Sequence, residues 1–206
     1  MVGNLFLTLL LLYQNVTQPV VSHLKLGTWI SSELLHITWG FNCDNLVLTM
    51  FFVVNLVSSL VHIYSCSYMA EDPHLPRFMS YLSLFTFFML LLVTADNLLQ
   101  LFLGWEGVGI CSYLLINFWF TRIQANKSAI QALIVNRISD VALTLGIITI
   151  FCAFRSIEFG TIFSLTPFFT NQNVSILGWE SNLLNLISLL LLLGAMGKSA
   201  QIFLHT

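Results

Sequence analysis

The sequence predicts an all-α protein, a polytopic bundle of transmembrane helices with one short β-hairpin between the first two spans. Three observations lead to this fold class. Of the 206 residues, 57% are hydrophobic and only 8% are charged, whereas a soluble domain carries about 25% charged residues. Apolar runs of about 20 residues recur along the chain, which is the length that crosses a bilayer as a helix. Ile37, Trp39 and Phe41 alternate with Thr38 and Gly40, a pattern typical of a strand in a hairpin.

Residues 1–13 are predicted to form a partial transmembrane helix. The stretch 2–13 is apolar, but as a helix it covers only about 18 Å, roughly half a crossing. We favour a span that is cut by the start of the chain, and a short anchor lying in the membrane interface is the alternative. Residues 14–45 then mix polar, β-branched and aromatic residues and are predicted to be an extramembrane loop with the hairpin.

Residues 46–206 are predicted to form the transmembrane bundle. Asp44 and Asn45 precede it as candidate helix caps, and Asp96 and Asn97 provide both a turn and a cap. Polar stretches separate the apolar runs, the longest of them a predicted loop at 153–179. The predicted spans are approximately 46–66, 77–95, 98–120, 128–152 and 181–206.

The distribution of basic residues predicts the orientation. Alternating crossings place the short loops 67–77 and 121–127, with Arg77, Arg122 and Lys127, on one side of the membrane. The positive-inside rule assigns that side to the cytoplasm or its organellar equivalent.

Several function classes are excluded by composition and spacing. A net charge of −2 does not indicate a nucleic-acid partner. The stretch Gly197-Lys198-Ser199 is not a phosphate-binding loop, because such a loop needs a first glycine where this chain has Leu192. The cysteines are tens of residues apart and predict neither a metal site nor a disulfide, namely Cys43, Cys66, Cys111 and Cys152.

Four charged residues fall near the middle of predicted spans and are the candidate functional residues: Glu106, Arg137, Asp140 and Lys198. Each costs about 2.5–3.5 kcal/mol at the middle of a membrane helix on insertion scales, whereas one leucine returns only about 0.3–0.6 kcal/mol. Their charges sum to zero. Such expensive groups usually mark ion or proton paths or bind one another.

The four charges support two interpretations. Arg137 and Asp140 are three residues apart and share a helix face, so a structural ion pair explains them as well as a function does. Glu106 and Lys198 have no oppositely charged residue near them in their own helices. They must meet neighbouring helices or water, which favours a role in proton transfer.

Glycines flank both of these residues, with Gly104, Gly107 and Gly109 beside Glu106 and Gly194 and Gly197 beside Lys198. Small residues let helices approach closely, and a helix that unwinds at its glycines would free carbonyls to meet the ammonium or water. Desolvation disfavours the charged ammonium. We therefore expect Lys198 to hold a proton while an ionised Glu106 favours it, and to release the proton when Glu106 binds Arg137 instead.

Histidines give a weaker signal. His62 lies at the end of an apolar run and His74 in a polar turn. Lone histidines in such places are usually structural, although imidazole can titrate near neutral pH.

Three long stretches carry a family resemblance: ADNLLQLFLGWEGVGICSYLLINFWF, ANKSAIQALIVNRISD and GAMGKSAQIFLHT. They resemble the family of NADH–ubiquinone oxidoreductase chain 5, the largest antiporter-like subunit of respiratory complex I, in its mitochondrial form. The resemblance runs from about Trp29 onward. It implies an antiporter-like inverted-repeat fold in the mitochondrial inner membrane, with the basic loops in the matrix.

The resemblance also implies roles for the four charged residues. Glu106 of GWEG and Lys198 of GKSAQ match proton-translocating residues, and Arg137 and Asp140 match the ion-pairing residues that tune them. In this family the lysine helix is broken at its middle. The chain itself is expected to carry no cofactor and no metal, since FMN, iron–sulfur clusters and ubiquinone belong to other subunits of the complex.

Family members are about three times as long as this chain. The expected partners are therefore the other membrane-arm subunits, lipids, and a separate polypeptide with the C-terminal remainder of the subunit; a truncated sequence is the competing explanation. The expected function is proton translocation coupled to NADH:ubiquinone electron transfer. The alternatives are a subunit of a multi-subunit cation/proton antiporter, or a structural fragment with an inactive channel.

Overall fold

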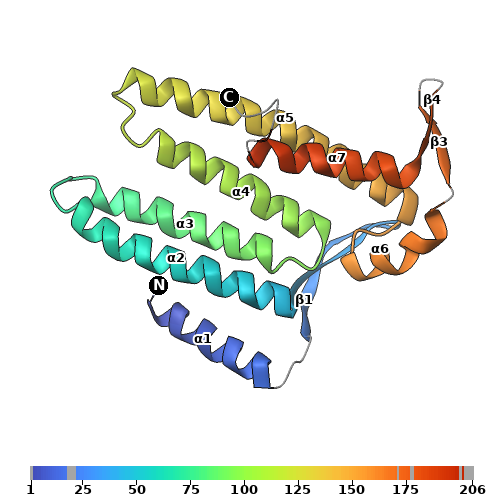
Figure 1. Ribbon diagram of the computed structural model, residues 1–206, viewed down its shortest axis with the longest axis horizontal. Helices are drawn as coiled ribbons and strands as arrows, with labels where there is room; N and C mark the ends of the chain where they lie inside the picture. The colour runs from blue at the N-terminus through green and yellow to red at the C-terminus, as the bar shows by residue number, and fades with distance from the viewer. Residues whose placement is uncertain (1, 18–21, 171, 177–178, 200, 202–206) are drawn as a thin grey trace. The chain divides into compact units, whose positions relative to one another are not determined.

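The computed structural model describes the whole chain except residues 1, 18–21, 171, 177–178, 200 and 202–206. Helices dominate this described part, and two short antiparallel hairpins accompany them (Figure 1). The elements in chain order are α1 (Val2–Thr17), β1 (Ser22–Ser31), β2 (His36–Cys43), α2 (Asn45–Tyr68), α3 (Leu75–Val93), α4 (Leu98–Ile116), α5 (Ile123–Phe154), α6 (Phe159–Leu165), the 3-10 helix η1 (Thr166–Phe169), β3 (Asn173–Ile176), β4 (Trp179–Asn182) and α7 (Leu183–Lys198).

The chain divides into two compact units. The first unit comprises Met1–Gly27, Trp39–Asp96 and Gln100–Ala129, and the second comprises Thr28–Thr38, Asn97–Leu99 and Ile130–Thr206. Helix α5 therefore contributes its first residues to one unit and the rest to the other.

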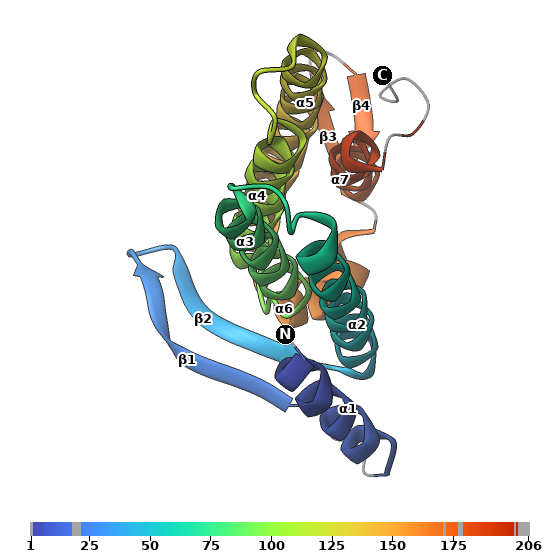
Figure 2. The ribbon, with the colours of Figure 1, turned by 90° about the vertical axis from the view of Figure 1, so that its left-hand side faces the viewer.

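Successive helices of the first unit are neighbours. Helix α2 contacts α1 on one side and α3 on the other, as Figures 1 and 2 both show. Helix α4 then lies against α3, since Gly104 and Gly107 touch Leu92 and Phe88. These paired contacts run in opposite directions along the two helices, so α3 and α4 are antiparallel.

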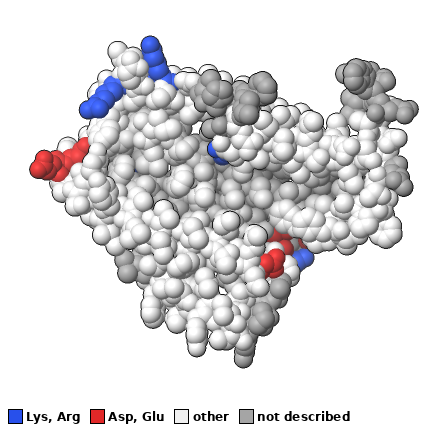
Figure 3. Space-filling view, viewed as in Figure 1, with Lys and Arg blue, Asp and Glu red and all other residues white. Residues whose placement is uncertain are grey.

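Four helices are long and apolar enough to cross a membrane within the described residues, namely α2, α3, α4 and α5. Their apolar side chains remain exposed in large numbers, as expected for surfaces that face lipid. Figure 3 shows that most of the visible face is uncharged and that charged side chains gather mainly at helix ends. The predicted fold class, a transmembrane helix bundle with a hairpin after the first helix, is confirmed.

Some of the predicted boundaries are wrong. The segment 121–127 is not a loop throughout, because α5 begins at Ile123. Its glutamine, alanine and lysine are good helix formers that extend the span beyond its apolar part. The predicted loop 153–179 contains α6, η1 and β3. Helix α1 reaches Thr17, four residues further than predicted.

The final span also differs from the prediction 181–206. Its helix begins after Asn182, whose side-chain oxygen accepts a hydrogen bond from the backbone of Leu184 at 3.0 Å, a typical N-cap. Glu180, two residues earlier, has strand backbone in β4. The helix ends at Lys198, and residues 200 and 202–206 lie outside the described part.

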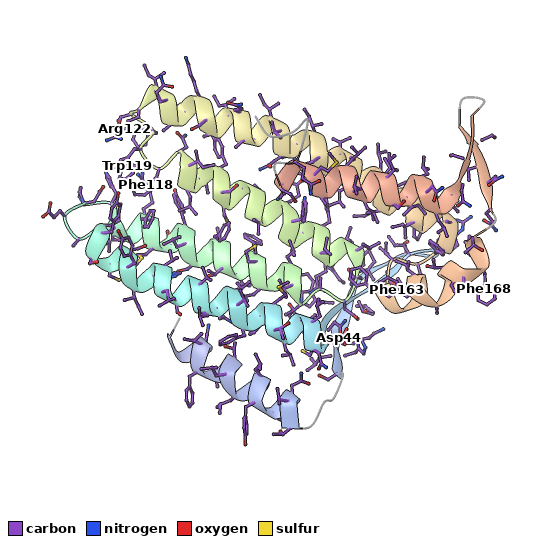
Figure 4. The ribbon with its side chains drawn as sticks, in the orientation of Figure 1. Asp44, Phe118, Trp119, Arg122, Phe163 and Phe168 are labelled. Atoms are coloured by element: carbon purple, nitrogen blue, oxygen red, sulfur yellow. The ribbon has the colours of Figure 1, made fainter. Side chains whose placement is uncertain are left out.

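The N-cap position of α2 was predicted correctly, but the carboxylate of Asp44 is used differently. Asp44 precedes the helix (Figure 4) and makes no side-chain cap hydrogen bond. Its carboxylate instead accepts a hydrogen bond from the side-chain amide of Asn42 at 2.9 Å. Asp44 thus ties the end of β2 to the start of α2.

Aromatic rings and arginines gather where α3 begins and α4 ends. The guanidinium of Arg77 lies 4.8 Å from the ring centroid of Phe118, and that of Arg122 lies 5.6 Å from Trp119. Figure 4 shows Phe118, Trp119 and Arg122 together in the turn after α4. Arginine and tryptophan at helix ends are characteristic of the membrane–water interface.

The close approach of α3 and α4 gives a testable prediction. A Cβ atom at position 104 would lie 2.8 Å from the backbone nitrogen of Leu92, and backbone cannot move aside as a side chain can. Gly104→Ala is therefore expected to destabilise the subunit by about 1–3 kcal/mol, as overpacking does. Thermal unfolding of the purified membrane protein measures this. Gly27→Ala is the control, because nothing lies within 4 Å of its added Cβ, and equal stability of the two variants would contradict the prediction.

Candidate functional site

Glu106 occupies the middle of α4, in the first unit. Its side chain is half-buried, and the glycines on either side of it, Gly104 and Gly107, are buried. Gly104 packs against the backbone of Leu92, and Gly107 packs against the ring of Phe88. The glycines therefore bring α3 close to the turn that carries the carboxylate, as the sequence indicated.

Helices α5 and α7 pack closely in the second unit, where Figure 1 draws them side by side. A Cβ atom at Gly146 of α5 would lie 3.1 Å from the side chain of Leu191, and one at Gly194 of α7 would lie 2.9 Å from the Cβ of Leu143. Gly197 lies directly against Ser139. The positions ascend on one helix as they descend on the other, so the two helices are antiparallel.

This packing sets the depth of Lys198. Because Gly197 touches Ser139, the next residue of α7 stands at the level of the α5 turn that runs from Arg137 to Asp140. Asp140 is buried, with only 4% of its surface exposed. Arg137 is exposed and Lys198 is half-buried. Three of the four predicted residues thus share one level of one unit.

The helix ends at the lysine. The backbone N–H of Ser199 bonds to the carbonyl of Ala195 at 3.1 Å, and that of Gln201 bonds to the carbonyl of Met196 at 3.2 Å. Both Gly194 and Gly197 are helical. The expectation that the helix unwinds at its glycines is therefore wrong, because the glycines serve close packing and the helix stops one residue later.

A helix C-terminus suits a cation. The last carbonyls of a helix lack intrahelical partners and carry partial negative charge. Lys198, the last helical residue, stands at that end of α7. The partial negative charge at that end of α7 therefore complements the charge of an ammonium group.

The fourth predicted residue belongs to the other unit. Glu106 lies in the first unit, and Arg137, Asp140 and Lys198 lie in the second. Each of the four takes part in at least one hydrogen-bonding, ionic, electrostatic or ring interaction. Pairing of Glu106 with Lys198, and the i, i+3 ion pair of Arg137 with Asp140, remain predictions.

Ser139 is a site residue that the sequence analysis missed. It is 1% exposed, and its hydroxyl donates to the carbonyl of Asn136 at 2.7 Å. That bond keeps the side chain against its own helix, which leaves room for Gly197. A small residue between the two charges of NRISD was the available signal, but its partner glycine on α7 could be identified only from the packing.

The described residues contain no group of three or more His, Cys, Asp or Glu side chains that could hold a metal ion. The second unit instead holds the buried side chain of Asp140. Arg137 lies three residues before it in the same helix, and Lys198 lies at the same level on α7. A buried carboxylate is costly unless it is hydrogen-bonded or paired. An arrangement of one acid and two bases can exchange partners, and proton release from the lysine can accompany that exchange.

Comparison with known families supports this description. Residues 95–206 match the family model described as NADH:quinone oxidoreductase/Mrp antiporter, TM. Residues 29–79 match the model described as NADH-Ubiquinone oxidoreductase (complex I), chain 5 N-terminus. Together they include all four candidate residues.

Individual relatives agree with the family models. The chain is 62% identical over 181 residues to NADH-ubiquinone oxidoreductase chain 5 of Chondrus crispus, covering 88% of this chain and 27% of that protein. It is 54% identical over 200 residues to the protein of the same name from Arabidopsis thaliana, covering 97% and 30%. The chain thus spans less than a third of the length of these relatives.

A solved structure shares the fold. The structure of the Mrp complex from Dietzia sp. DQ12-45-1b matches with a TM-score of 0.75 at 20% identity, over 93% of this chain and 20% of that one. At this identity the likeness concerns the fold alone. It supports the antiporter-like arrangement of the helices.

Proposed function

Because the chain belongs to the NADH:quinone oxidoreductase/Mrp antiporter family, we propose that it translocates protons as part of the membrane arm of mitochondrial respiratory complex I. The proposal rests on one observation. Lys198 stands at the level of the Arg137–Asp140 turn, because glycines pack α7 closely against α5. The relatives described above bear the name chain 5 of NADH-ubiquinone oxidoreductase. They favour complex I over the alternative of a cation/proton antiporter subunit.

In this proposal Lys198 holds the proton that moves. Asp140 is buried on the neighbouring helix at the same level, and its carboxylate stabilises the ammonium when it faces Lys198. When the carboxylate is neutralised by Arg137 instead, the ammonium loses that support and gives its proton to water. Arginine stays protonated throughout, so Arg137 can compete for the carboxylate without carrying the proton itself.

Glu106 supplies the second acid. Its carboxylate lies on a glycine-flanked turn of the first unit, where α3 packs closely. An ionised Glu106 would attract a proton into the first unit. Electron transfer occurs elsewhere in the complex in this proposal, so this chain carries no redox cofactor and contributes proton chemistry only.

One experiment tests membership of the complex. Mitochondrial membranes are solubilised in mild detergent, separated on a native gel, stained for NADH oxidation, and analysed by intact-mass measurement. The chain is expected in the NADH-oxidising band, beside the other membrane-arm subunits. The measured mass also gives its length and detects any second polypeptide that aligns with the rest of the relatives. Recovery of the chain only from bands that do not oxidise NADH would favour the antiporter alternative.

A further inference from the structure

One face of α2 is polar from Asn55 to Ser65, within a membrane-spanning helix. Asn55, Ser58, Ser59, His62 and Ser65 recur at intervals of three and four residues, so at 100° per residue they fall within about 120° of one helix face. All except the half-buried histidine are buried, with exposures between 2% and 6%. A buried polar face in a span is expensive and usually functional.

Each ring nitrogen of His62 lies within hydrogen-bonding distance of an oxygen atom. Its Nδ1 lies 2.7 Å from the backbone carbonyl of Ser58, which can only accept, so Nδ1 donates. Its Nε2 lies 3.4 Å from the hydroxyl of Ser83 on α3, and that hydroxyl already donates its proton to the carbonyl of Met79 at 2.8 Å. The Ser83 oxygen therefore faces Nε2 as an acceptor. Each ring nitrogen therefore has an oxygen atom near it that can take part in a proton-transfer step.

The histidine also has access to the outside of the helix pair. A groove of about 290 Å³ runs between α2 and α3, and its lining includes Ser58, His62 and Thr86 among apolar side chains. Thr86 is 7% exposed and bonds to the carbonyl of Ser83. The surface of the groove is apolar, so it leaves space beside the imidazole and adds no polar partner of its own.

At the inner end of the polar face stands an unsatisfied donor. Asn55 is 3% exposed, and its side-chain nitrogen finds no hydrogen-bond partner among the described residues. Buried amide groups of this kind are normally satisfied by internal water. Asn55 lies seven residues from His62, which is about 10 Å along the helix.

The depth of Asn55 matches that of Glu106. Helix α3 lies between α2 and α4 in the first unit, which holds α4 from Gln100 onward. The His62–Ser83 contact on one side of α3, and the Gly104–Leu92 and Gly107–Phe88 contacts on the other, put Asn55 and Glu106 at about the level of Leu90. The polar face therefore runs from the loop end of α2 to the depth of the intramembrane acid.

We propose that the polar face of α2 is a hydrated proton-loading track, with His62 as its proton-binding entry group and Asn55 as its inner water-binding end. The track rests on the proposed function, since it supplies protons toward the depth of Glu106 for translocation. One proton from water binds Nε2 while the Nδ1 proton passes to the Ser58 hydroxyl, 3.3 Å away, and that hydroxyl releases its own proton to water. One proton has then been taken up and one released, so the ring is neutral again, with its remaining proton on Nε2.

Other ionisable groups near the track are few. The described part of α1 carries no acidic or basic residue and one tyrosine, Tyr13. On α3 the charged residue is Arg77, whose guanidinium lies against Phe118, and Tyr81 lies one turn further along that helix. On α2 itself Cys66 and the tyrosines Tyr64 and Tyr68 complete the set. His62 is the imidazole among these groups, the side chain that can both accept and donate a proton at a ring nitrogen.

The test is proton pumping by the assembled, liposome-reconstituted enzyme, measured per NADH oxidised across pH 6 to 9 around the ordinary imidazole range. His62→Gln keeps a side-chain donor but cannot bind a proton, and Asn55→Leu replaces the buried donor with an apolar group of similar size. Both variants are expected to pump several-fold less, and His62→Gln is expected to have a flatter pH profile. His74→Gln is the matched control, since His74 is exposed in the turn before α3.

A purely structural role predicts other results. If His62 only ties α2 to α3, His62→Gln retains pumping in whatever enzyme assembles. Asn55→Leu would then be neutral or stabilising, because it removes an unsatisfied donor. Native pumping in both variants, with pumping lost in Lys198→Met, overturns the track and leaves the proposed function standing. Native pumping in Lys198→Met as well overturns the proposed function and the track with it.

Discussion

Lys198→Met is expected to lower NADH-driven proton pumping by about 100-fold, the lower end of what a positioned proton-transfer group contributes. Methionine keeps the length and apolar stem of lysine and removes the ammonium. Because Lys198 ends α7 at the level of the Arg137–Asp140 turn, its loss also leaves a buried carboxylate with one candidate cation fewer. Pumping is measured in proteoliposomes with a fluorescent ΔpH probe.

Two further variants separate proton transfer from simple charge. Lys198→Arg keeps the positive charge, yet arginine cannot release its proton in a protein, so this variant should assemble normally and pump as poorly as Lys198→Met. Lys127→Met serves as control, since Lys127 is exposed near the start of α5. If Lys198→Arg pumped like the native enzyme, Lys198 would be a structural cation, and the proton would follow another route.

Composition was sufficient to predict the long spans. Membrane insertion depends on summed hydrophobicity over about 20 residues, and α2, α3 and α4 therefore lie within a few residues of their predicted ranges. The hairpin after α1 was equally clear from alternation over Ile37–Phe41.

Shorter elements were not predictable by the same means. The β3–β4 pair has four residues per strand, which is too short for alternation to stand out from chance. Helix α6 has only seven residues and lies in a segment whose polar residues resemble a loop. The start of α5 extends beyond its apolar run because helix propensity, not hydrophobicity, governs exposed turns.

For the candidate site, the sequence identified the charges but not their arrangement. Four ionisable groups in apolar runs are visible without a structure. Lys198 stands at the level of Asp140 because Gly197 of α7 packs against Ser139 of α5, a contact that the sequence does not reveal. His62 illustrates the same limit, since a lone histidine in a span is ambiguous until its acceptors on Ser58 and Ser83 are known.

Close helix packing and intramembrane charge are coupled in this chain. Each candidate proton-transfer residue follows or adjoins a glycine that touches a neighbouring helix: Gly107 beside Glu106 and Gly197 beside Lys198. Close packing excludes lipid and holds the charged turn at a fixed depth. Variants at these glycines therefore change the position of a charge without changing the charge itself.

Gly197→Ala is accordingly expected to impair pumping although it removes no ionisable group. The added methyl would overlap the Cβ and hydroxyl of Ser139, so α7 must move away from α5 and carry Lys198 with it. Such overpacking costs about 1–3 kcal/mol. Thermal stability of the assembled enzyme and pumping per NADH are measured together, and both should fall.

The matched control on the same helix pair is Gly146→Ala. Its Cβ would lie 3.1 Å from Cδ2 of Leu191, the far end of a flexible side chain that can move aside, so its effect should be smaller.

The decisive variant is the double substitution Gly197→Ala with Ser139→Gly, which exchanges the small residue between the two helices. If the clash alone is responsible, the double variant recovers stability and pumping, while Ser139→Gly by itself has a modest effect. A Gly197→Ala enzyme that pumps and unfolds like the native one would show that the depth of Lys198 does not depend on this contact. Loss of pumping that the double variant fails to restore would place the role of Gly197 in its own backbone, at the turn where α7 ends.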